Sequence, residues 1–363
     1  MVSARARLTF LCVQDFANVS TEISHALRTH SKRWETRVLA CTPHPFGYAR
    51  KHDWDRENIT NGEAGEALEF LDSSSVVVWA EESGTIGDPC SAYGTAPRGP
   101  ASVLLRNRSA RRYTFHAGAA YRNHAGRFNA LDNQIFHGQL CAPDLVRFGP
   151  SARTVWGKPM EVDFEEVDGL WKARREYGKI VVTHSPSNLV LKGTSMLRKV
   201  MTNVMKACPN VEYRELGGPA GSHLLHEELM LQRAGAVLHL DQYHVGIGGA
   251  GIASHEAQAR GTLALASMNK TCSAAYEHWG FSPETCPIIP LFFEKMERAS
   301  DRQTERALTA LLTKLGQTSL DDLEARGRAA ARWVHDHHSA APFVKSWEVQ
   351  LDALEAAAAK RAA

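Results

Sequence analysis

Short apolar runs alternate with helical periodicity along most of the chain, and this alternation limits the fold to an α/β architecture. Strands that follow one another across intervening helices form parallel sheets with helices on both faces. The runs of the N-terminal half predict strands at 8–13, 36–41, 75–80, 112–118, 134–140 and 154–156.

The alternation stops at an acidic, loop-like segment, 160–169, where we expect the linker between two domains, and then starts again. Thr194 is the expected N-cap of a helix with a wide apolar stripe. Further strands are predicted at 179–185, 211–216, 236–240 and 262–267. We therefore expect two doubly wound domains, 1–165 and 170–335, and a C-terminal helix, 336–363, that crosses back to the N-terminal domain.

Composition indicates a soluble globular protein and leaves the partner open. The 363 residues are 44% hydrophobic and 23% charged, with a formal net charge of +2, which does not require a nucleic-acid partner. The seven cysteines are scattered without a C-x-x-C pair, which argues against a disulfide framework and a zinc site. With no signal peptide and no apolar window of membrane-spanning length, we expect a cytoplasmic protein.

A glycine-rich stretch follows the strand at 236–240. Gly246, Gly248 and Gly251 formally satisfy G-x-G-x-x-G, but the next strand does not end in the acid that a nicotinamide-binding unit requires. The glycine amides and the following helix could instead hold a diphosphate, with Glu256 accepting hydrogen bonds from ribose hydroxyls. The alternative is a tight turn into a helix whose Glu256 faces water.

A second polar segment follows the strand at 179–185. Hydroxyls, a cation and a helix N-terminus converge there, at the strand edge where open α/β sheets bind ligands. Lys192 alone could also be an ordinary surface lysine. The candidate ligand-binding side chains of this segment are His184, Ser185, Ser187 and Lys192.

These motifs carry a resemblance to a known family. HSPSN with KGT, LDQYHVGIGGAG and HEAQARGTLAL together resemble the C-terminal donor domain of family-4-type glycosyltransferases of the GT-B fold, of the small bacterial or bacteriophage type. QDFANVSTEISHAL, FHAGAAYR, APDL and GRAAARWVHDHHS are similar to other segments of that family. The resemblance is strong over 180–268 and weak before 110. It implies two Rossmann-like domains facing a cleft.

The resemblance also implies roles for individual residues. Lys192 would neutralise the diphosphate of a nucleotide sugar, with a UDP-sugar favoured, and Glu256 would bind the ribose. The amides of Gly248, Gly249 and Gly251 would lie against phosphate or sugar. The chain departs from the family at position 248, where glycine replaces the first acid of E-x7-E, so the donor and the stereochemical outcome stay open. No D-x-D cluster or His/Asp spacing suggests a catalytic metal, and we expect a metal-independent hexosyltransferase without a cofactor.

The N-terminal half is expected to receive the acceptor. His116, after an apolar strand, could face the cleft as a catalytic residue or be a core histidine. Asp15 could orient or deprotonate an acceptor hydroxyl, or cap a helix. Arg122 could contact diphosphate or acceptor, or lie on the surface.

A basic cluster in the same half suggests the acceptor. The arginines of this cluster could bind the phosphates of a nucleic acid, contact an anionic membrane surface, or form a face exposed to solvent. We expect a hydroxymethylated pyrimidine in bacteriophage DNA. The alternatives are a cell-surface glycan or lipid-linked acceptor, a nucleotide-sugar epimerase or phosphorylase, and a non-catalytic sugar-nucleotide or DNA-binding module. The cluster comprises Arg106, Arg108, Arg111 and Arg112.

Overall fold

The computed structural model divides the chain into two compact units. The first unit is Met1–Pro159 with Ala340–Ala363, and the second unit is Met160–Ser339. The structure describes residues 5–42, 47–54, 64–80, 107–117, 121–122, 125–126, 128–130, 136–146, 148–149, 151–190, 192–217, 224–243, 249–268, 272, 274, 288–290 and 301–362.

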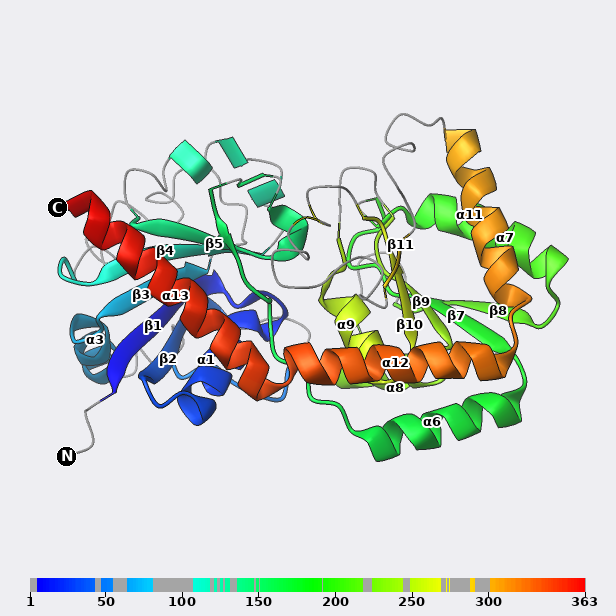
Figure 1. The fold of residues 1–363 in the computed structure, drawn as a ribbon, viewed down its shortest axis with the longest axis horizontal. Coiled ribbons are helices and arrows are strands. Elements are labelled where there is room, and N and C mark those ends of the chain that lie inside the picture. The colour runs from blue at the N-terminus through cyan, green and yellow to red at the C-terminus, as the bar shows by residue number, and fades with distance from the viewer. Residues whose placement is uncertain are drawn as a thin grey trace. The chain divides into compact units, whose positions relative to one another are not determined.

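The first unit is built on a parallel six-stranded sheet with strand order β2-β1-β3-β4-β5-β6 (Figure 1). Because β2 and β3 lie on opposite sides of β1, the chain winds in both directions from its first strand, as in a doubly wound fold. The strands are β1 (Ala6–Gln14), β2 (Trp34–Thr42), β3 (Val76–Ala80), β4 (Arg111–His116), β5 (Gly138–Cys141) and β6 (Arg153–Thr154).

Helices cover the sheet of the first unit on both faces. Leu11 packs in a cluster with residues of α3 (Ala64–Asp72). Phe10, its neighbour on β1, contacts Trp347 of α13 (Ala340–Ala362) at 5.9 Å between ring centroids. Successive side chains of a strand point to opposite faces, so α3 and α13 lie on opposite faces. Helix α13 also packs against α1 (Val19–His30).

The second unit repeats this plan with a five-stranded sheet, ordered β11-β10-β9-β7-β8, whose strands are also parallel. Its first strand is flanked by its second and third, as in the first unit, which makes it doubly wound as well. The strands are β7 (Ile180–His184), β8 (Val211–Glu215), β9 (Leu238–Leu240), β10 (Leu263–Ala266) and β11 (Ile289–Pro290).

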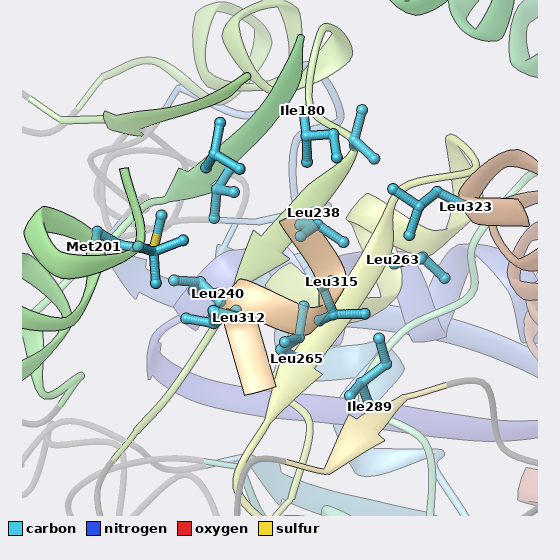
Figure 2. Close-up of a cluster of buried hydrophobic side chains, with 14 of the residues drawn as sticks. Ile180, Met201, Leu238, Leu240, Leu263, Leu265, Ile289, Leu312, Leu315 and Leu323 are labelled. Atoms are coloured by element: carbon cyan, nitrogen blue, oxygen red, sulfur yellow. The ribbon is translucent and has the colours of Figure 1, made fainter. Parts of the chain in front are cut away.

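A large apolar cluster joins this sheet to its helices. In Figure 2, side chains of the sheet lie in one cluster with side chains of the helices. The labelled sheet residues include Leu238, Leu240, Leu263 and Leu265, and the labelled helix residues include Leu312, Leu315 and Leu323. Figure 1 shows α7 and α11 on one side of the sheet and α6, α8 and α12 on the other. The connections through α7 and α8 run in opposite directions along the sheet, which places these two helices on opposite faces. The helices are α6 (Phe164–Tyr177), α7 (Thr194–Ala207), α8 (His226–Ala234), α9 (Ile252–Ala259), α11 (Asp301–Gly316) and α12 (Leu320–His338).

One buried arginine ties three elements of the second unit together. Arg174 of α6 donates hydrogen bonds to the carbonyls of Ala234, Arg260 and Gly261 and to the hydroxyl of Thr262. The first two carbonyls lie at the ends of α8 and α9, where backbone acceptors lack partners within the helix. Arg174 therefore donates hydrogen bonds to the C-termini of α8 and α9. Burial lowers the pKa of its guanidinium to about 9.

The structure corrects three expectations about local structure. The segment predicted as a loop becomes helical at Phe164, because Asp163 accepts hydrogen bonds from the amides of Glu165 and Glu166 and caps α6. The N-cap of α7 is Gly193, whose φ of 68° suits glycine, and Thr194 is the first helical residue. The two-residue strand β11 was not predicted.

Among the helices that the structure describes, none combines the length and apolar character needed to cross a membrane.

Candidate functional site

The strand order of the second unit marks a position for a ligand. Strands β8 and β9 lie on either side of β7, so the connections after β7 and after β8 leave in opposite directions. Ligands of open α/β sheets bind outside the carboxyl ends of the strands at such a switch point. Here those ends carry His184, the last residue of β7, with Ser185 after it, and Asp241 and Gln242 after β9.

A buried carboxylate organises this edge of the sheet. The Nζ atom of Lys192 donates to Oδ1 of Asp241 at 2.7 Å, and Oδ2 accepts from the amide of Gly251 and the hydroxyl of Ser254, both at 2.8 Å. Burial alone would raise the pKa of Asp241, but the Lys192 ammonium and the hydrogen bonds hold it well below its usual value. Asp241 is therefore ionised and joins the Lys192 loop to the N-terminus of α9.

Gln242 extends this network to the glycine stretch. Its Oε1 accepts from Lys192 at 3.1 Å, and its Nε2 donates to the carbonyl of Gly249 at 2.6 Å. The amide of Gly249 in turn donates to the carbonyl of Ser267. Gly249 has a φ of 129°, which an L-amino acid rarely adopts. The two residues after β9 thus hold both the lysine and the backbone ahead of α9.

The described glycine amides have acceptors within the protein, and their contact with phosphate or sugar stays a prediction. The amides of Gly249 and Gly251 donate to the carbonyl of Ser267 and the carboxylate of Asp241, so they do not point toward an external phosphate in this structure. The helix N-terminus that favours an anion already holds the side chain of Asp241. Gly246 and Gly248 lie outside the described residues.

His184 is a buried structural residue. Its Nδ1 lies 2.7 Å from the carbonyl oxygen of Leu240 and its Nε2 lies 2.9 Å from Oγ1 of Thr194. Burial lowers its pKa to about 4, so the ring is neutral at pH 7, Nδ1 carries the proton and Nε2 accepts from the hydroxyl. Both nitrogens have partners within the protein, and contact of His184 with a donor stays a prediction that this geometry does not support.

Glu256 lies in a second cluster next to the first. Its Oε2 accepts from Nη1 of Arg233 at 2.9 Å, and its Oε1 lies 2.9 Å from Nε2 of His226. Glu256 is 6% exposed, so the alternative in which it faces water is wrong. Arg233 also donates to the hydroxyl of Ser185. Ser187 lies exposed in the turn that follows.

Helix α9 connects the two clusters. Its start, at Gly251 and Ser254, contacts Asp241, and Glu256 belongs to the next turn. The structure therefore brings Lys192, Ser185 and Glu256 to one edge of the second sheet, and each of them is held by a residue that was not predicted. An ammonium and a carboxylate at this edge can bind a phosphate-bearing nucleoside.

In the first unit, Asp15 has the geometry of a helix cap. Its Oδ1 accepts from the amide of Ser20 at 2.7 Å, and its Oδ2 accepts from the amide of Thr21 at 2.8 Å and from the Thr21 hydroxyl at 2.5 Å. The capping alternative thus describes this residue. Its role as a base stays a prediction.

His116 ends β4 and is buried in the first unit. Its ring stacks on Tyr121, with centroids 3.8 Å apart and an interplanar angle of 6°. Arg122, next to Tyr121, pairs with Asp144 at 3.1 Å. Strands β1 and β4 are separated by β3, so the ends that carry Asp15 and His116 lie about 10 Å apart. A catalytic role for His116 stays a prediction.

The basic cluster lies at the other edge of the same sheet. Arg111 and Arg112 begin β4 and His116 ends it, so the arginines and the histidine are about 15 Å apart along the strand. Arg108 is exposed in the turn before β4, and Arg106 lies outside the described residues. Contact of Arg108, Arg111 and Arg112 with the acceptor stays a prediction, and their end of the strand is opposite the carboxyl edge at which ligands of such sheets bind.

The sequence reasoning missed Asp241, Gln242, Arg233 and His226. A polar pair directly after the apolar run AVLHL was the available signal for the first two. The other two lie on a helix and meet the site only because α8 packs beside α9, which local patterns do not reveal. Among the residues that the structure describes, no group of three or more histidine, cysteine or acidic side chains is arranged to hold a metal ion.

The chain matches no protein-family model, and no curated protein matches it in sequence. Solved structures do resemble it. HepE of Anabaena in complex with UDP and glucose has a TM-score of 0.55 at 9% identity, over 96% of this chain and 100% of that one. A mutant of the O-GlcNAc transferase of Thermobaculum terrenum has a TM-score of 0.53 at 13% identity, over 100% of this chain and 70% of that one.

A third similar structure is the N-terminal domain of trehalose-6-phosphate phosphatase from Candida albicans, with a TM-score of 0.52 at 9% identity over 97% of both chains. At such identities the likeness shows the fold alone. The chain has the fold of GT-B glycosyltransferases, with two Rossmann-like doubly wound units of the same strand order.

Proposed function

We propose that this protein is a glycosyltransferase that takes a sugar from a nucleoside-diphosphate sugar and transfers it to an acceptor hydroxyl. The observation that carries the proposal is the Lys192–Asp241 pair at the start of α9, at the switch point of the second sheet. HepE, which shares the fold, forms complexes with UDP and with UDP-glucose. A UDP-hexose is therefore the donor that we propose.

The ion pair leaves Lys192 able to meet an anion. An ammonium has three N–H donors. Among the described residues, Asp241 and Gln242 each accept one hydrogen bond from Lys192. The side chain of Lys192 is 16% exposed, whereas that of Asp241 is 1% exposed. A diphosphate can thus approach from the solvent side while Asp241 stays behind the ammonium and fixes its position.

The chemistry requires stabilisation of the leaving diphosphate and placement of the acceptor hydroxyl. In the proposed mechanism Lys192 offsets negative charge on the leaving group, and Glu256 holds the ribose. We propose that the transfer needs no metal ion, because a fixed cation can stabilise a leaving diphosphate. His116, Asp15 and Arg122 remain the candidates for contact with the acceptor.

The acceptor is the open part of the proposal. Hydroxymethylated DNA and glycans are both carried into the test, and the position of Arg111 and Arg112 gives no support to DNA. Purified protein would be incubated with a panel of nucleotide sugars and with hydroxymethylated DNA, plain DNA and glycan acceptors, with and without EDTA. Mass spectrometry of the products should detect transfer from a UDP-hexose, unchanged by EDTA.

A double variant gives this assay its control. Lys192→Ala alone would leave the buried Asp241 carboxylate unpaired, which is costly. Lys192→Gln combined with Asp241→Asn removes both charges together and is expected to fold but to lose transfer by at least about 100-fold. Transfer at the wild-type rate by the folded double variant would contradict the proposal. Conversion of the donor without acceptor would indicate an epimerase, and binding without turnover a non-catalytic module.

A further inference from the structure

A buried arginine contacts two side chains of the candidate site. Arg233 lies in the last turn of α8 and is 4% exposed. Its Nη1 donates to Oε2 of Glu256 at 2.9 Å, and its Nη2 donates to the hydroxyl of Ser185. One guanidinium therefore holds the acid of α9 and the hydroxyl that follows β7.

The other oxygen of Glu256 has a more exposed partner. His226, at the start of α8, places Nε2 2.9 Å from Oε1, and its side chain is 25% exposed, against 5% for Arg233. Residues 226 and 233 are seven positions apart, two helical turns, so they lie on one face of α8. The carboxylate thus has one partner on its buried side and one toward solvent.

Stability alone does not explain this arrangement. A buried ion pair adds little net stability compared with apolar side chains of the same volume, because both charges lose their hydration. Its effect is on geometry, since a guanidinium fixes the plane and orientation of the group that it binds. A carboxylate fixed through Oε2 presents Oε1 in one direction.

We propose that Arg233 is a positioning residue that orients Glu256 and Ser185 for the ribose of the donor, and so gives the site its preference for a nucleotide over a bare diphosphate. This rests on the proposed function, because it takes Glu256 as the ribose-binding acid. Ribose hydroxyls replace His226 at Oε1 while Arg233 keeps Oε2. Lys192, which contacts Asp241 and not Glu256, serves the diphosphate independently.

The independence of the two clusters gives a selective test. Isothermal titration calorimetry would measure the affinities of wild type, Arg233→Gln and Arg233→Lys for UDP and for inorganic pyrophosphate. Loss of an oriented charged hydrogen bond is expected to weaken UDP binding by about 10- to 100-fold in Arg233→Gln. Pyrophosphate binding should change by less than about 3-fold, and Arg233→Lys should recover part of the UDP affinity by restoring a cation beside Glu256.

The matched control is Arg175→Gln, which removes an arginine that pairs with Glu324 in another part of the same unit. It should bind both ligands as the wild type does. Wild-type UDP affinity in Arg233→Gln, or an equal loss for both ligands, would overturn the positioning role. If Arg233→Gln does not fold, Arg233→Lys decides, because an unchanged ratio of UDP to pyrophosphate affinity overturns the role equally. A wild type that binds pyrophosphate but not UDP would instead reject the proposed donor, and the positioning role with it.

Discussion

Single residues at the end of β9 determine how the candidate site is held together. Asp241 contacts a lysine 49 residues earlier and the start of the following helix, so one carboxylate aligns two segments. This arrangement leaves no room for a side chain at Gly251, because a Cβ atom there would meet Oδ2 of Asp241 at 2.8 Å. A larger residue at 251 would therefore displace the carboxylate from the helix.

The buried His184 predicts a dependence of stability on pH. Its pKa is 6.5 in the unfolded chain and about 4 in the folded protein, because burial penalises the charged ring. The folded pKa is lowered, so the stabilisation is full above pH 6.5 and is lost as the pH falls toward 4. His184 should account for a loss of about 2 kcal/mol in the free energy of unfolding between pH 7 and pH 5.

Urea denaturation at the two pH values would measure this loss. Burial also lowers the pKa of His255 to about 4, so the informative quantity is the difference between wild type and His184→Gln. We expect a smaller loss between pH 7 and pH 5 in the variant. Equal losses in the two proteins would show that His184 does not carry the effect.

At the scale of elements, helix packing in the second unit depends on close backbone approach. Helix α12 crosses the turn between α9 and β10 at Gly327, where a Cβ atom would overlap the carbonyl oxygen of Gly261 and the ring of Trp171. A backbone carbonyl cannot move aside as a flexible side chain can. The position of α12 against α9 is therefore fixed by the absence of a side chain.

Two glycine-to-alanine changes in helices should have opposite effects. Gly327→Ala is expected to destabilise the second unit by about 2 to 3 kcal/mol through overpacking. Gly169→Ala in α6 meets nothing within 4 Å and should stabilise by about 0.5 to 1 kcal/mol, because alanine has the higher helix propensity. Chemical denaturation followed by tryptophan fluorescence would measure both. The same sign for the two changes would be incompatible with this packing.

At the scale of the whole molecule, the last helix is part of the first unit although it follows the second in sequence. Trp347 of α13 is fully buried, with its ring centroid 5.4 Å from that of Phe115, and its Nε1 donates to the carbonyl of Trp156 at 3.1 Å. The core of the first unit is thus incomplete without α13.

Trp347→Ala should destabilise the first unit by about 3 to 5 kcal/mol, because it leaves a cavity against the sheet. The change should leave the second unit at its wild-type stability. Hydrogen exchange measured by mass spectrometry would report faster exchange in β1 and β4 but not in β7 and β9. Val349→Ala, at a position 54% exposed on the same helix, is the control and should change stability by less than about 0.5 kcal/mol. Faster exchange in both units would argue against two separate cores.

Most strands could be predicted because buried parallel strands are rich in apolar residues, and ten of the eleven strands that the structure describes overlap a predicted strand. The two-residue β11 is too short to give that signal. Lys192 and Glu256 could be identified from the sequence, because Lys192 lies after the end of a predicted strand and Glu256 lies after the glycine-rich stretch. The partners Asp241 and Arg233 depend on strand order and on helix packing, which join residues far apart in sequence, and the use of both nitrogens of His184 depends on the same contacts.

A crystal structure with UDP bound would test most directly where this chain holds a nucleotide. We predict the diphosphate within hydrogen-bonding distance of Nζ of Lys192, and the ribose hydroxyls on the carboxylate of Glu256, with Asp241 still paired to the lysine. A nucleotide bound in the first unit alone, or bound without contact to Lys192 and Glu256, would contradict the assignment.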